Sequence, residues 1–287
     1  MIIFDFSQLL HFSLHSSMKL TGSKEPDINT MRIIILNKIQ YFRGKFKSEY
    51  GEETIIAVDN KTWRKEVFPN YKFKRKKNRD EDLMDWKEIH KIFTTIKEEI
   101  IENLPYKVID VTGAEGDDVI FILTLAYKNE PILILSVDKD FEQLHINENV
   151  KQYNPSFDKS VDYDRSAIVY NLFSHIAHGD SSDGISSIIS DSDCFVNAVR
   201  QKPLKTAYIQ QAFEEAKKGN LEKFLGTKRF ARFQENKTLI DCRCVPEFVK
   251  TKILEAYSKY EVKPNNIYNY LVDKNLTKQF FQEIRNF

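Results

Sequence analysis

The sequence predicts an α/β fold in which a central, mostly parallel sheet with flanking helices is followed by a smaller helical C-terminal region. Two observations support this prediction. Over residues 1–155, short apolar runs alternate with segments of helical spacing, which is typical of parallel strands joined by helical crossovers. From about residue 162 the strand patterns fade and helical spacing remains. A hydrophobic content of 41%, with 21 Phe and 13 Tyr, is ample for a packed core.

The predicted elements follow in chain order. Strands are expected where short runs are almost continuously apolar, at residues 1–6, 54–59, 106–111 and 131–138. Between them, apolar residues at helical spacing predict helices at residues 27–45, 86–101 and 115–127. The second half is expected to hold helices at residues 162–178, 205–218, 246–260, 264–272 and 276–285. The last segment includes QFFQEIRNF (279–287), whose paired aromatic residues either pack in the core or dock on a partner.

Nine carboxylates lie at the ends of these apolar runs or at the starts of helices. They are Asp5, Asp59, Glu115, Asp117, Asp118, Asp138, Asp140, Asp180 and Asp183. The carboxyl ends of neighbouring parallel strands meet at one edge of a sheet, so these side chains are expected to converge on one crevice. Like charges at short range repel, and hard cations such as Mg²⁺ or Mn²⁺ prefer oxygen ligands. The pattern predicts a metal-dependent phosphoryl-transfer enzyme.

The net charge of +1 hides a segregation of charge along the chain. Without the nine acids the rest of the molecule carries +10, and residues 200–287 hold 18 Lys/Arg against 10 Asp/Glu. The densest basic run is YKFKRKKNR at residues 71–79, between the second strand and the next helix. This run is either a solvated charged loop or part of a nucleic-acid-binding surface. An acidic pocket within a basic surface is what a nuclease needs.

The remaining patterns exclude several other classes. The cysteines Cys194, Cys242 and Cys244 have neither a disulfide framework nor zinc-ligand spacing. No apolar stretch is long enough to span a membrane, and no signal peptide is expected at the N-terminus. We therefore expect a protein of a reducing cytoplasm. None of the six histidines has the spacing of a metal ligand with a partner. His178, close to Asp180 in the sequence, is expected to pack or to lie at the surface; the alternative is that it hydrogen-bonds to Asp180 and orients it.

The order of the motifs resembles the flap endonuclease-like 5′ nucleases, a family that includes bacterial and phage 5′→3′ exonucleases. The matching motifs are the strand-end Asp5, the pair Val58–Asp59, R-x(6)-YK-x-x-R (Arg64, Tyr71, Lys72, Arg75), E-x-D-D, S-x-D-x-D and G-D-x-x-D. The C-terminal part, including RFQENKTLID (232–241), is similar to the branch that contains the ribonuclease H of T-even bacteriophages. The resemblance implies a PIN-like 5′-nuclease fold. It also implies a nuclease domain at residues 1–180, with a basic arch at about residues 60–85, and a helical DNA-binding domain at residues 181–287.

The resemblance further implies roles for individual residues. Two Mg²⁺ ions are expected, for which Mn²⁺ can substitute. The first would be held by Asp5, Asp59, Glu115 and Asp117, and the second by Asp118, Asp138, Asp140, Asp180 and Asp183. Lys72 and Arg75 would contact the scissile phosphate as catalytic cations. The arch would bind nucleic acid through Arg64, Lys74, Lys76, Lys77 and Arg79.

The activity implied is hydrolysis from the 5′ ends of RNA–DNA and DNA–DNA duplexes and cutting of 5′ flaps. A monomer would remove RNA primers from lagging-strand fragments during phage DNA replication, with a single-strand-binding protein and a sliding clamp as expected partners. One departure is the segment at residues 183–198, where Ser and Asp replace the glycines of the family's helix–hairpin–helix, so we expect it to bind duplex poorly. Two alternatives stay open: a PIN-like endoribonuclease and a non-catalytic structure-specific DNA-binding protein.

Overall fold

A computed structural model describes residues 1–280, which form two compact units. Unit 1 contains Met1–Lys61, Leu83–Asp162 and the chain from Phe248 onward, and unit 2 contains Thr62–Asp82 and Tyr163–Glu247. Residues 281–287, which make up most of the QFFQEIRNF segment, lie outside the described residues. The units are defined by their internal contacts. The functional division into a nuclease domain and a DNA-binding domain at residue 180 stays a prediction.

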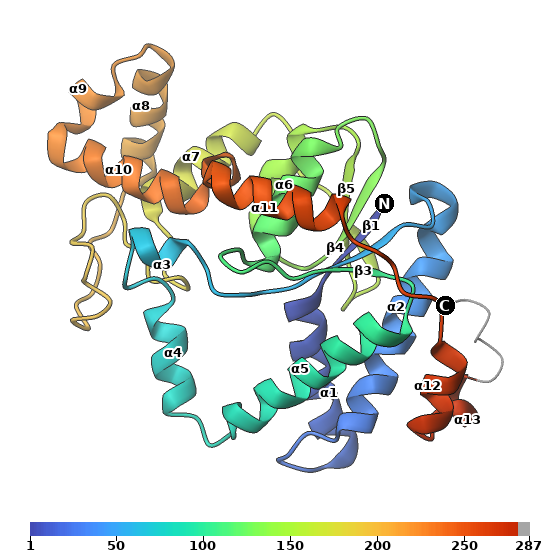
Figure 1. Cartoon of the computed structure of the whole chain (residues 1–287). Helices are drawn as coiled ribbons and strands as arrows, with labels where there is room; N and C mark the ends of the chain where they lie inside the picture. Colours follow the sequence, from blue (N-terminus) through green and yellow to red (C-terminus); the bar gives the residue numbers. More distant parts are fainter. Residues whose placement is uncertain (281–287) are drawn as a thin grey trace. The chain divides into compact units, whose positions relative to one another are not determined.

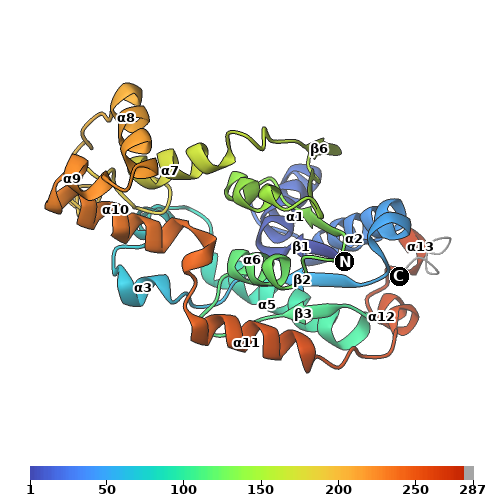
Figure 2. The ribbon, with the colours of Figure 1, turned by 90° about the horizontal axis from the view of Figure 1, so that it is seen from above.

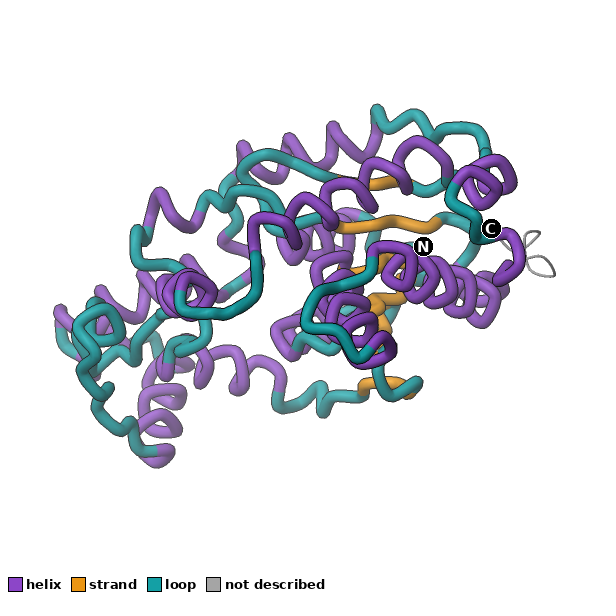
Figure 3. The backbone as a smooth tube through the Cα atoms, turned by 90° about the horizontal axis from the view of Figure 1, so that it is seen from below, coloured by secondary structure: helices purple, strands orange, loops and turns teal. Residues whose placement is uncertain are grey.

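Unit 1 is built around a six-stranded sheet with the order β3-β2-β1-β4-β5-β6. Its strands are β1 (Ile2–Asp5), β2 (Thr54–Ala57), β3 (Lys107–Ile109), β4 (Ile132–Leu135), β5 (Val150–Asn154) and β6 (Lys159–Val161). Every neighbouring pair is parallel except β5 and β6, which are antiparallel. Figure 2 shows β1, β2 and β3 side by side, and Figure 3 shows the same sheet in orange from below. The predicted mostly parallel sheet is confirmed, and β5 and β6 are strands that the sequence did not reveal.

Helices cover both faces of this sheet. They are α1 (Phe6–Thr21), α2 (Ile28–Tyr50), α5 (Trp86–Asn103), α6 (Gly116–Ala126), η1 (Lys139–Ile146), α11 (Glu247–Ser258, entering unit 1 at Phe248), α12 (Ile267–Asp273) and α13 (Thr277–Phe280). In Figure 1, α1 and α5 lie on one side of the sheet and α6 on the other. Ile2, Phe4 and Ile56 share one core cluster with residues of α1, α2, α5 and α12. Because side chains alternate along a strand, Ile3 and Ile55 face the opposite side, where α6 contacts β1 and β2.

Aspartates set where the helices on the first face begin. Asp27 accepts a hydrogen bond from Thr30 N at 2.7 Å and caps α2, and Asp85 accepts one from Glu88 N at 3.1 Å and caps α5. Asp5 accepts a hydrogen bond from Gln8 N at 3.0 Å and caps α1. Asp5 is therefore both the last residue of β1 and the cap of α1, which fixes its carboxylate at the carboxyl edge of the sheet.

Unit 2 is helical. It contains α3 (Arg64–Val67), α4 (Phe73–Asp80), α7 (Ile168–His178), α8 (Thr206–Lys217), α9 (Leu221–Leu225), α10 (Thr227–Ile240) and η2 (Cys242–Cys244). Tyr71, Ile176, Ile185 and Phe233 belong to its core. Within residues 1–280, no helix has both the length and the apolar character that crossing a membrane requires.

The segment at residues 183–198 forms turns rather than a pair of helices. Ser186 of this segment is hydrogen-bonded from within unit 2. The buried Asn236 of α10 donates to the carbonyl oxygens of Ile176 and Ser186, both at 2.9 Å, and Arg232 Nη2 donates to Ser186 Oγ at 2.9 Å. The guanidinium of Arg232 is thus used for packing within unit 2.

Candidate active site

Three predicted acids lie beyond the carboxyl ends of neighbouring strands in unit 1. Asp5 ends β1, Asp59 follows β2 and Asp138 follows β4. The strand order reverses between β1 and β4, because the chain builds β2 and β3 on one side of β1 and β4 on the other. In open α/β sheets, ligands bind outside the strand ends at such a reversal. The sheet therefore places these acids where a ligand site is expected.

Ser136 connects two of these acids. Its hydroxyl donates to Asp5 Oδ2 at 2.8 Å and accepts from Asp138 N at 3.1 Å. Gln152 Nε2 donates to the carbonyl oxygens of Ser136 and Asp138, at 3.0 and 2.8 Å. Ser136 is fully buried, so the end of β4 is fixed from two sides. The sequence analysis noted Ser136 only as the first letter of S-x-D-x-D and gave it no role.

The electrostatics of this edge are unfavourable to several ionised carboxylates. The pKa of Asp5 is raised from 3.8 to about 6. Burial is the main cause, and the charges of Asp59 and Asp138 add to it, while hydrogen bonds from Gln8 and Ser136 act in the opposite direction. A divalent cation would relieve this repulsion, and an all-oxygen donor set fits a hard ion. The residues present therefore suit a divalent metal.

The E-x-D-D motif opens α6 and is tied to β2. Gly116 N donates to Asp59 Oδ1 at 2.7 Å, and Glu115 N donates to Asp118 Oδ2 at 3.0 Å. Asp117 and Asp118 lie in the first turn of α6, where the helix dipole favours negative charge. Asp118 is fully buried and helps to begin the helix. These contacts bring Asp59 next to the E-x-D-D motif.

Gly116→Ala is expected to lower the free energy of unfolding by about 1–3 kcal/mol, because an added methyl group overfills this junction. A Cβ at Gly116 would lie 3.1 Å from Asp59 Oδ1 and 3.2 Å from the carbonyl oxygen of Ala57. Urea unfolding measures the effect. Gly44→Ala in α2 is the matched control, because a Cβ there meets nothing within 4 Å. The control should be neutral or stabilising, and an equal loss in both variants would contradict the close approach at Gly116.

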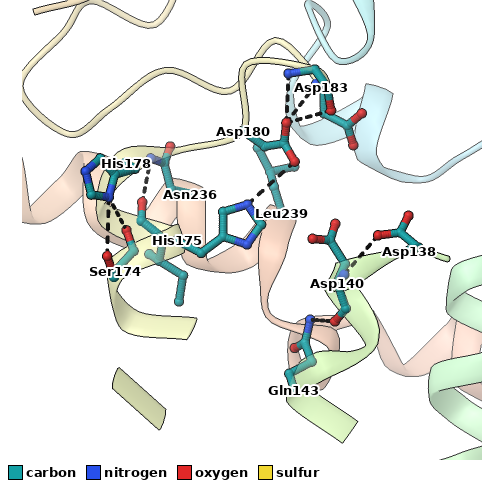
Figure 4. A network of polar contacts seen from close by, with 12 residues as sticks. Asp138, Asp140, Gln143, Ser174, His175, His178, Asp180, Asp183, Asn236 and Leu239 are labelled. Carbon is teal, nitrogen blue, oxygen red and sulfur yellow. Dashed lines mark hydrogen bonds and ion pairs between the residues drawn. The ribbon is translucent and has the colours of Figure 1, made fainter. Parts of the chain in front are cut away.

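Asp138 and Asp140 begin η1. Asp138 Oδ1 accepts a hydrogen bond from Asp140 N at 2.9 Å, and Gln143 Nε2 donates to the Asp140 carbonyl oxygen at 3.0 Å (Figure 4). Unit 1 thus contains most of the predicted acids, namely Asp5, Asp59, Glu115, Asp117, Asp118, Asp138 and Asp140.

The other two predicted acids, Asp180 and Asp183, lie in the turn after α7 in unit 2. Asp180 Oδ1 accepts hydrogen bonds from Ser182 N and Ser182 Oγ, both at 2.7 Å. Its Oδ2 faces His175 Nε2 at 3.5 Å (Figure 4). Burial acts to raise the pKa of Asp180, but the hydrogen bonds from His175 and Ser182 outweigh it and hold that pKa below its usual range. Asp180 is therefore held as a carboxylate.

His175 contacts one of the predicted acids, although the sequence analysis assigned it no role. His178, which lies nearer to Asp180 in the sequence, instead contacts the Ser174 carbonyl oxygen through its Nδ1 at 2.9 Å, within its own helix (Figure 4). The available signal was the position of His175 in the last turn of α7, just before the chain reverses at Gly179. Gly179 has φ +71° and a Cβ there would lie 2.4 Å from the Ile185 carbonyl oxygen, so only glycine permits this reversal.

The predicted catalytic cations also belong to unit 2. Arg75 Nη2 lies 2.7 Å from Asp183 Oδ1, and Lys72 N donates to the Asp183 carbonyl oxygen at 2.8 Å. Burial raises the pKa of Asp183, while the positive charges of Lys72 and Arg75 act to lower it. The YK-x-x-R and G-D-x-x-D motifs are far apart in the sequence, and unit 2 brings them into contact.

The residues predicted to bind nucleic acid differ in exposure. Lys76, Lys77 and Arg79 are exposed on α4, and Lys74 Nζ lies 3.8 Å from the centre of the Phe195 ring. Arg64 is only 5% exposed, and its Nε donates to the Leu239 carbonyl oxygen at 3.0 Å. These contacts give Arg64 a packing role in unit 2. Its contact with nucleic acid stays a prediction.

Residues 1–172 match the family described as 5′-3′ exonuclease, N-terminal resolvase-like domain. The chain belongs to the 5′→3′ exonuclease family. A second match, over residues 166–287, is to the family described as T4 RNase H, C terminal. The resemblance inferred from the motifs is thereby confirmed, together with the fold class.

Individual relatives agree with this assignment. The Ribonuclease H of Enterobacteria phage T4 is 29% identical over 286 residues, which cover 96% of this chain and 92% of the phage protein. A 5′-3′ exonuclease of Mycoplasmopsis pulmonis is 32% identical over 152 residues, covering 52% of this chain and 46% of that protein.

Solved structures of a phage T5 enzyme share the fold. The T5 5′-exonuclease with bound zinc ions superposes with a TM-score of 0.57 at 15% identity, covering 90% of this chain and 98% of that chain. A T5 flap endonuclease complex with DNA and metal ions gives a TM-score of 0.57 at 14% identity, covering 99% and 98% of the two chains.

Membership of this family makes the chain an enzyme of the hydrolase class, a structure-selective 5′ nuclease. The match to the phage T4 protein extends through the C-terminal region. An endoribonuclease that shares only the PIN-like fold would not account for that extension.

Proposed function

We propose that this 5′→3′ exonuclease is Mg²⁺-dependent and removes RNA primers from lagging-strand fragments during phage DNA replication. It would hydrolyse RNA–DNA and DNA–DNA duplexes from their 5′ ends and cut 5′ flaps. The observation that carries the proposal is the acidic edge of unit 1, where Asp59 and Asp138 help to raise the pKa of Asp5 to about 6. Such a set of carboxylates is costly for the folded chain, and divalent cations would offset that cost.

The proposed metal ligands are all carboxylates. In unit 1 they are Asp5, Asp59, Glu115, Asp117, Asp118, Asp138 and Asp140, and in unit 2 they are Asp180 and Asp183. Bound Mg²⁺ would activate a water molecule and stabilise the charge that develops on the scissile phosphate, and Mn²⁺ would substitute. Ser136 and Gln8 would orient Asp5, whose carboxylate accepts hydrogen bonds from both. His175 and Ser182 would orient Asp180 in the same way.

The proposed substrate contacts are the basic residues of α4 and the turn before it. Lys72 and Arg75 would neutralise the scissile phosphate, since positioned cations act most strongly on charge that develops during reaction. Lys74, Lys76, Lys77 and Arg79 would bind the sugar–phosphate backbone, with Arg64 behind them, so that selection would depend on structure rather than base sequence. On the basis of the family resemblance, the enzyme would act as a monomer in the host cytoplasm. Its partners would be a single-strand-binding protein and a sliding clamp, which binding assays test separately.

Cleavage of end-labelled substrates tests the proposal. A 5′-flap duplex and a nicked RNA–DNA hybrid, each labelled at both ends, are incubated with the wild type in Mg²⁺ or in chelator. We expect Mg²⁺-dependent products that are short from the 5′ end or cut near the flap junction. Intact binding without any cleavage would instead support the non-catalytic DNA-binding alternative. Cleavage of circular single-stranded RNA would support the endoribonuclease alternative.

Lys72→Ala is expected to slow cleavage by roughly 100-fold while weakening substrate binding only mildly, because its charge acts on the reacting phosphate. Single-turnover rates and the Kd for a 5′-flap duplex in Ca²⁺ measure the two effects. Lys76→Ala, on the exposed part of α4, is the matched control and should change mainly the Kd. A Lys72→Ala variant that loses rate and affinity by the same factor would contradict a role in the chemical step.

A further inference from the structure

Tyr71 lies at the base of α4 and has no role in the function proposed above. Its side chain is 4% exposed and packs in the core of unit 2 with Ile176 and Ile185. Its hydroxyl nevertheless reaches a charged group and donates to Asp183 Oδ2 at 2.8 Å. A ring buried to this degree offers no face on which a base can stack. The contact that distinguishes Tyr71 from a phenylalanine is therefore the one to Asp183.

Asp183 receives three contacts from the segment around Tyr71. Tyr71 Oη donates to one carboxylate oxygen, Arg75 Nη2 lies 2.7 Å from the other, and Lys72 N donates to the Asp183 carbonyl oxygen at 2.8 Å. The backbones also approach closely, since a Cβ at Gly184 would lie 3.0 Å from the Asn70 carbonyl oxygen. The residues that precede α4 are thus fastened to Asp183 by side chain and by main chain.

Lys72 has an unusual backbone conformation at this point. Its φ of +57° is left-handed, which L-residues with a side chain rarely adopt. Such a conformation persists only where the surrounding contacts over-determine it. Two hydrogen bonds to Asp183 supply those contacts. One comes from the backbone amide of Lys72 and the other from the hydroxyl of Tyr71. The left-handed backbone at Lys72, from which its side chain projects, is therefore tied to Asp183.

We propose that Tyr71 is a positioning residue: its hydroxyl holds Asp183, which in turn fixes the turn at Lys72 and the guanidinium of Arg75. This inference rests on the proposed function of Lys72 and Arg75 at the scissile phosphate. In this role Tyr71 acts through Asp183 rather than on the reacting atoms. Without this hydroxyl, the charges of Lys72 and Arg75 remain but are held less firmly in position. A displacement of about 1 Å at a reacting group can slow the reaction by up to roughly 100-fold.

Tyr71→Phe tests the inference because it removes one oxygen and keeps the buried ring. We expect kcat on a 5′-flap duplex to fall about 10-fold with KM unchanged. Tyr208→Phe is the matched control, since that hydroxyl accepts from Arg229 Nη1 at 3.1 Å elsewhere in unit 2, and its kcat should equal the wild type's. The double variant Tyr71→Phe/Arg75→Ala should be little slower than Arg75→Ala alone, because residues that act as one unit are not additive.

Trypsin provides a readout that does not depend on cleavage of nucleic acid. Residues 72–79 include six Lys and Arg residues, so the rate of tryptic cleavage there reports how firmly the base of α4 is held. In the full chain without substrate, Tyr71→Phe should be cut in this segment several-fold faster than the wild type, and Tyr208→Phe should not. Urea unfolding of both variants checks that global stability is comparable.

The outcomes separate the two proposals. A wild type that cleaves no substrate overturns the proposed function, whatever trypsin shows. An active wild type with unchanged kcat in Tyr71→Phe overturns the inference, even if tryptic cleavage is faster, because the hydroxyl would then be only a packing contact. Equal tryptic rates and full additivity with Arg75→Ala would also overturn it.

Discussion

Asp138→Asn is expected to lower Mg²⁺-dependent cleavage by roughly 100-fold or more, with the fold retained. The variant removes one negative charge from the edge of unit 1 where Asp5 and Asp59 also lie. Asparagine keeps the oxygen that accepts from Asp140 N at 2.9 Å, and it caps a helix as well as aspartate does. Single-turnover cleavage of a 5′-flap duplex measures the rate, and circular dichroism with urea unfolding measures the fold.

Asp162→Asn is the control for Asp138→Asn. Asp162 is an exposed acid just after β6. The described contact of its carboxylate is a long hydrogen bond from Ser160 Oγ at 3.4 Å. Its neutralisation should leave the rate unchanged. A wild-type rate in Asp138→Asn would remove Asp138 from the proposed metal ligands. A loss in both variants would indicate a general charge effect instead of a specific site.

Asp5→Asn is expected to raise the free energy of unfolding by about 1–3 kcal/mol at about pH 8 in chelator, while abolishing cleavage. The pKa of the folded carboxyl is about 6, against 3.8 as the reference. As the pH rises from about 4 through about 6, the folded wild type must ionise Asp5 in unfavourable surroundings and loses stability. The variant has no such group, and its amide keeps an oxygen that can accept from Gln8 N.

The sign of this effect is tested by its pH dependence. The stability difference between Asp5→Asn and the wild type should be near zero at about pH 4 and should grow through about pH 6. Thermal unfolding in chelator and then in Mg²⁺ supplies a second check, because an ion that binds only the folded wild type stabilises it. A variant that is less stable than the wild type at pH 8 would show that the hydrogen bonds to Asp5 outweigh the repulsion.

The strands that carry the site were predictable because they are buried on both faces. Residues 54–59 and 131–138 are almost continuously apolar up to the acids that end them, so these acids could be located from sequence. β5 and β6 gave no such signal. In β5 an exposed Lys151 lies between buried neighbours, and in β6 both Lys159 and Ser160 are exposed. These two strands are recognised by their antiparallel pairing at the edge of the sheet rather than by an apolar run. The helix α1 was also missed, because its run FSQLLHFSLHSS contains Ser and His residues that favour helices weakly.

Contacts within unit 2 depend on tertiary packing and could not be read from local patterns. Arg64 belongs to a basic motif and was predicted to bind nucleic acid. In the structure it is buried, and its Nε donates to the Leu239 carbonyl oxygen at the end of α10. His175 has an ordinary sequence context, and Tyr71 was noted only as one letter of the YK-x-x-R motif. Only the folding of the turn after α7 brings Asp180 and Asp183 to them. The sequence located the acids correctly at strand and helix ends, whereas the side chains that orient them come from distant segments.

The interleaving of the two units constrains how a newly made chain can fold. The chain leaves unit 1 after Lys61 and re-enters it at Leu83. It leaves again after Asp162 and re-enters at Phe248. The core of unit 1 joins Ile2 and Phe4 to Ile267, Leu271 and Phe280. During synthesis, this core can therefore be completed only after the last helices have been made, although α1, α2 and α5 are made earlier. Contacts between segments so far apart in sequence slow folding and prolong the exposure of apolar surface, so we expect this enzyme to depend on chaperones during synthesis and unit 1 to fold poorly when translation stops early.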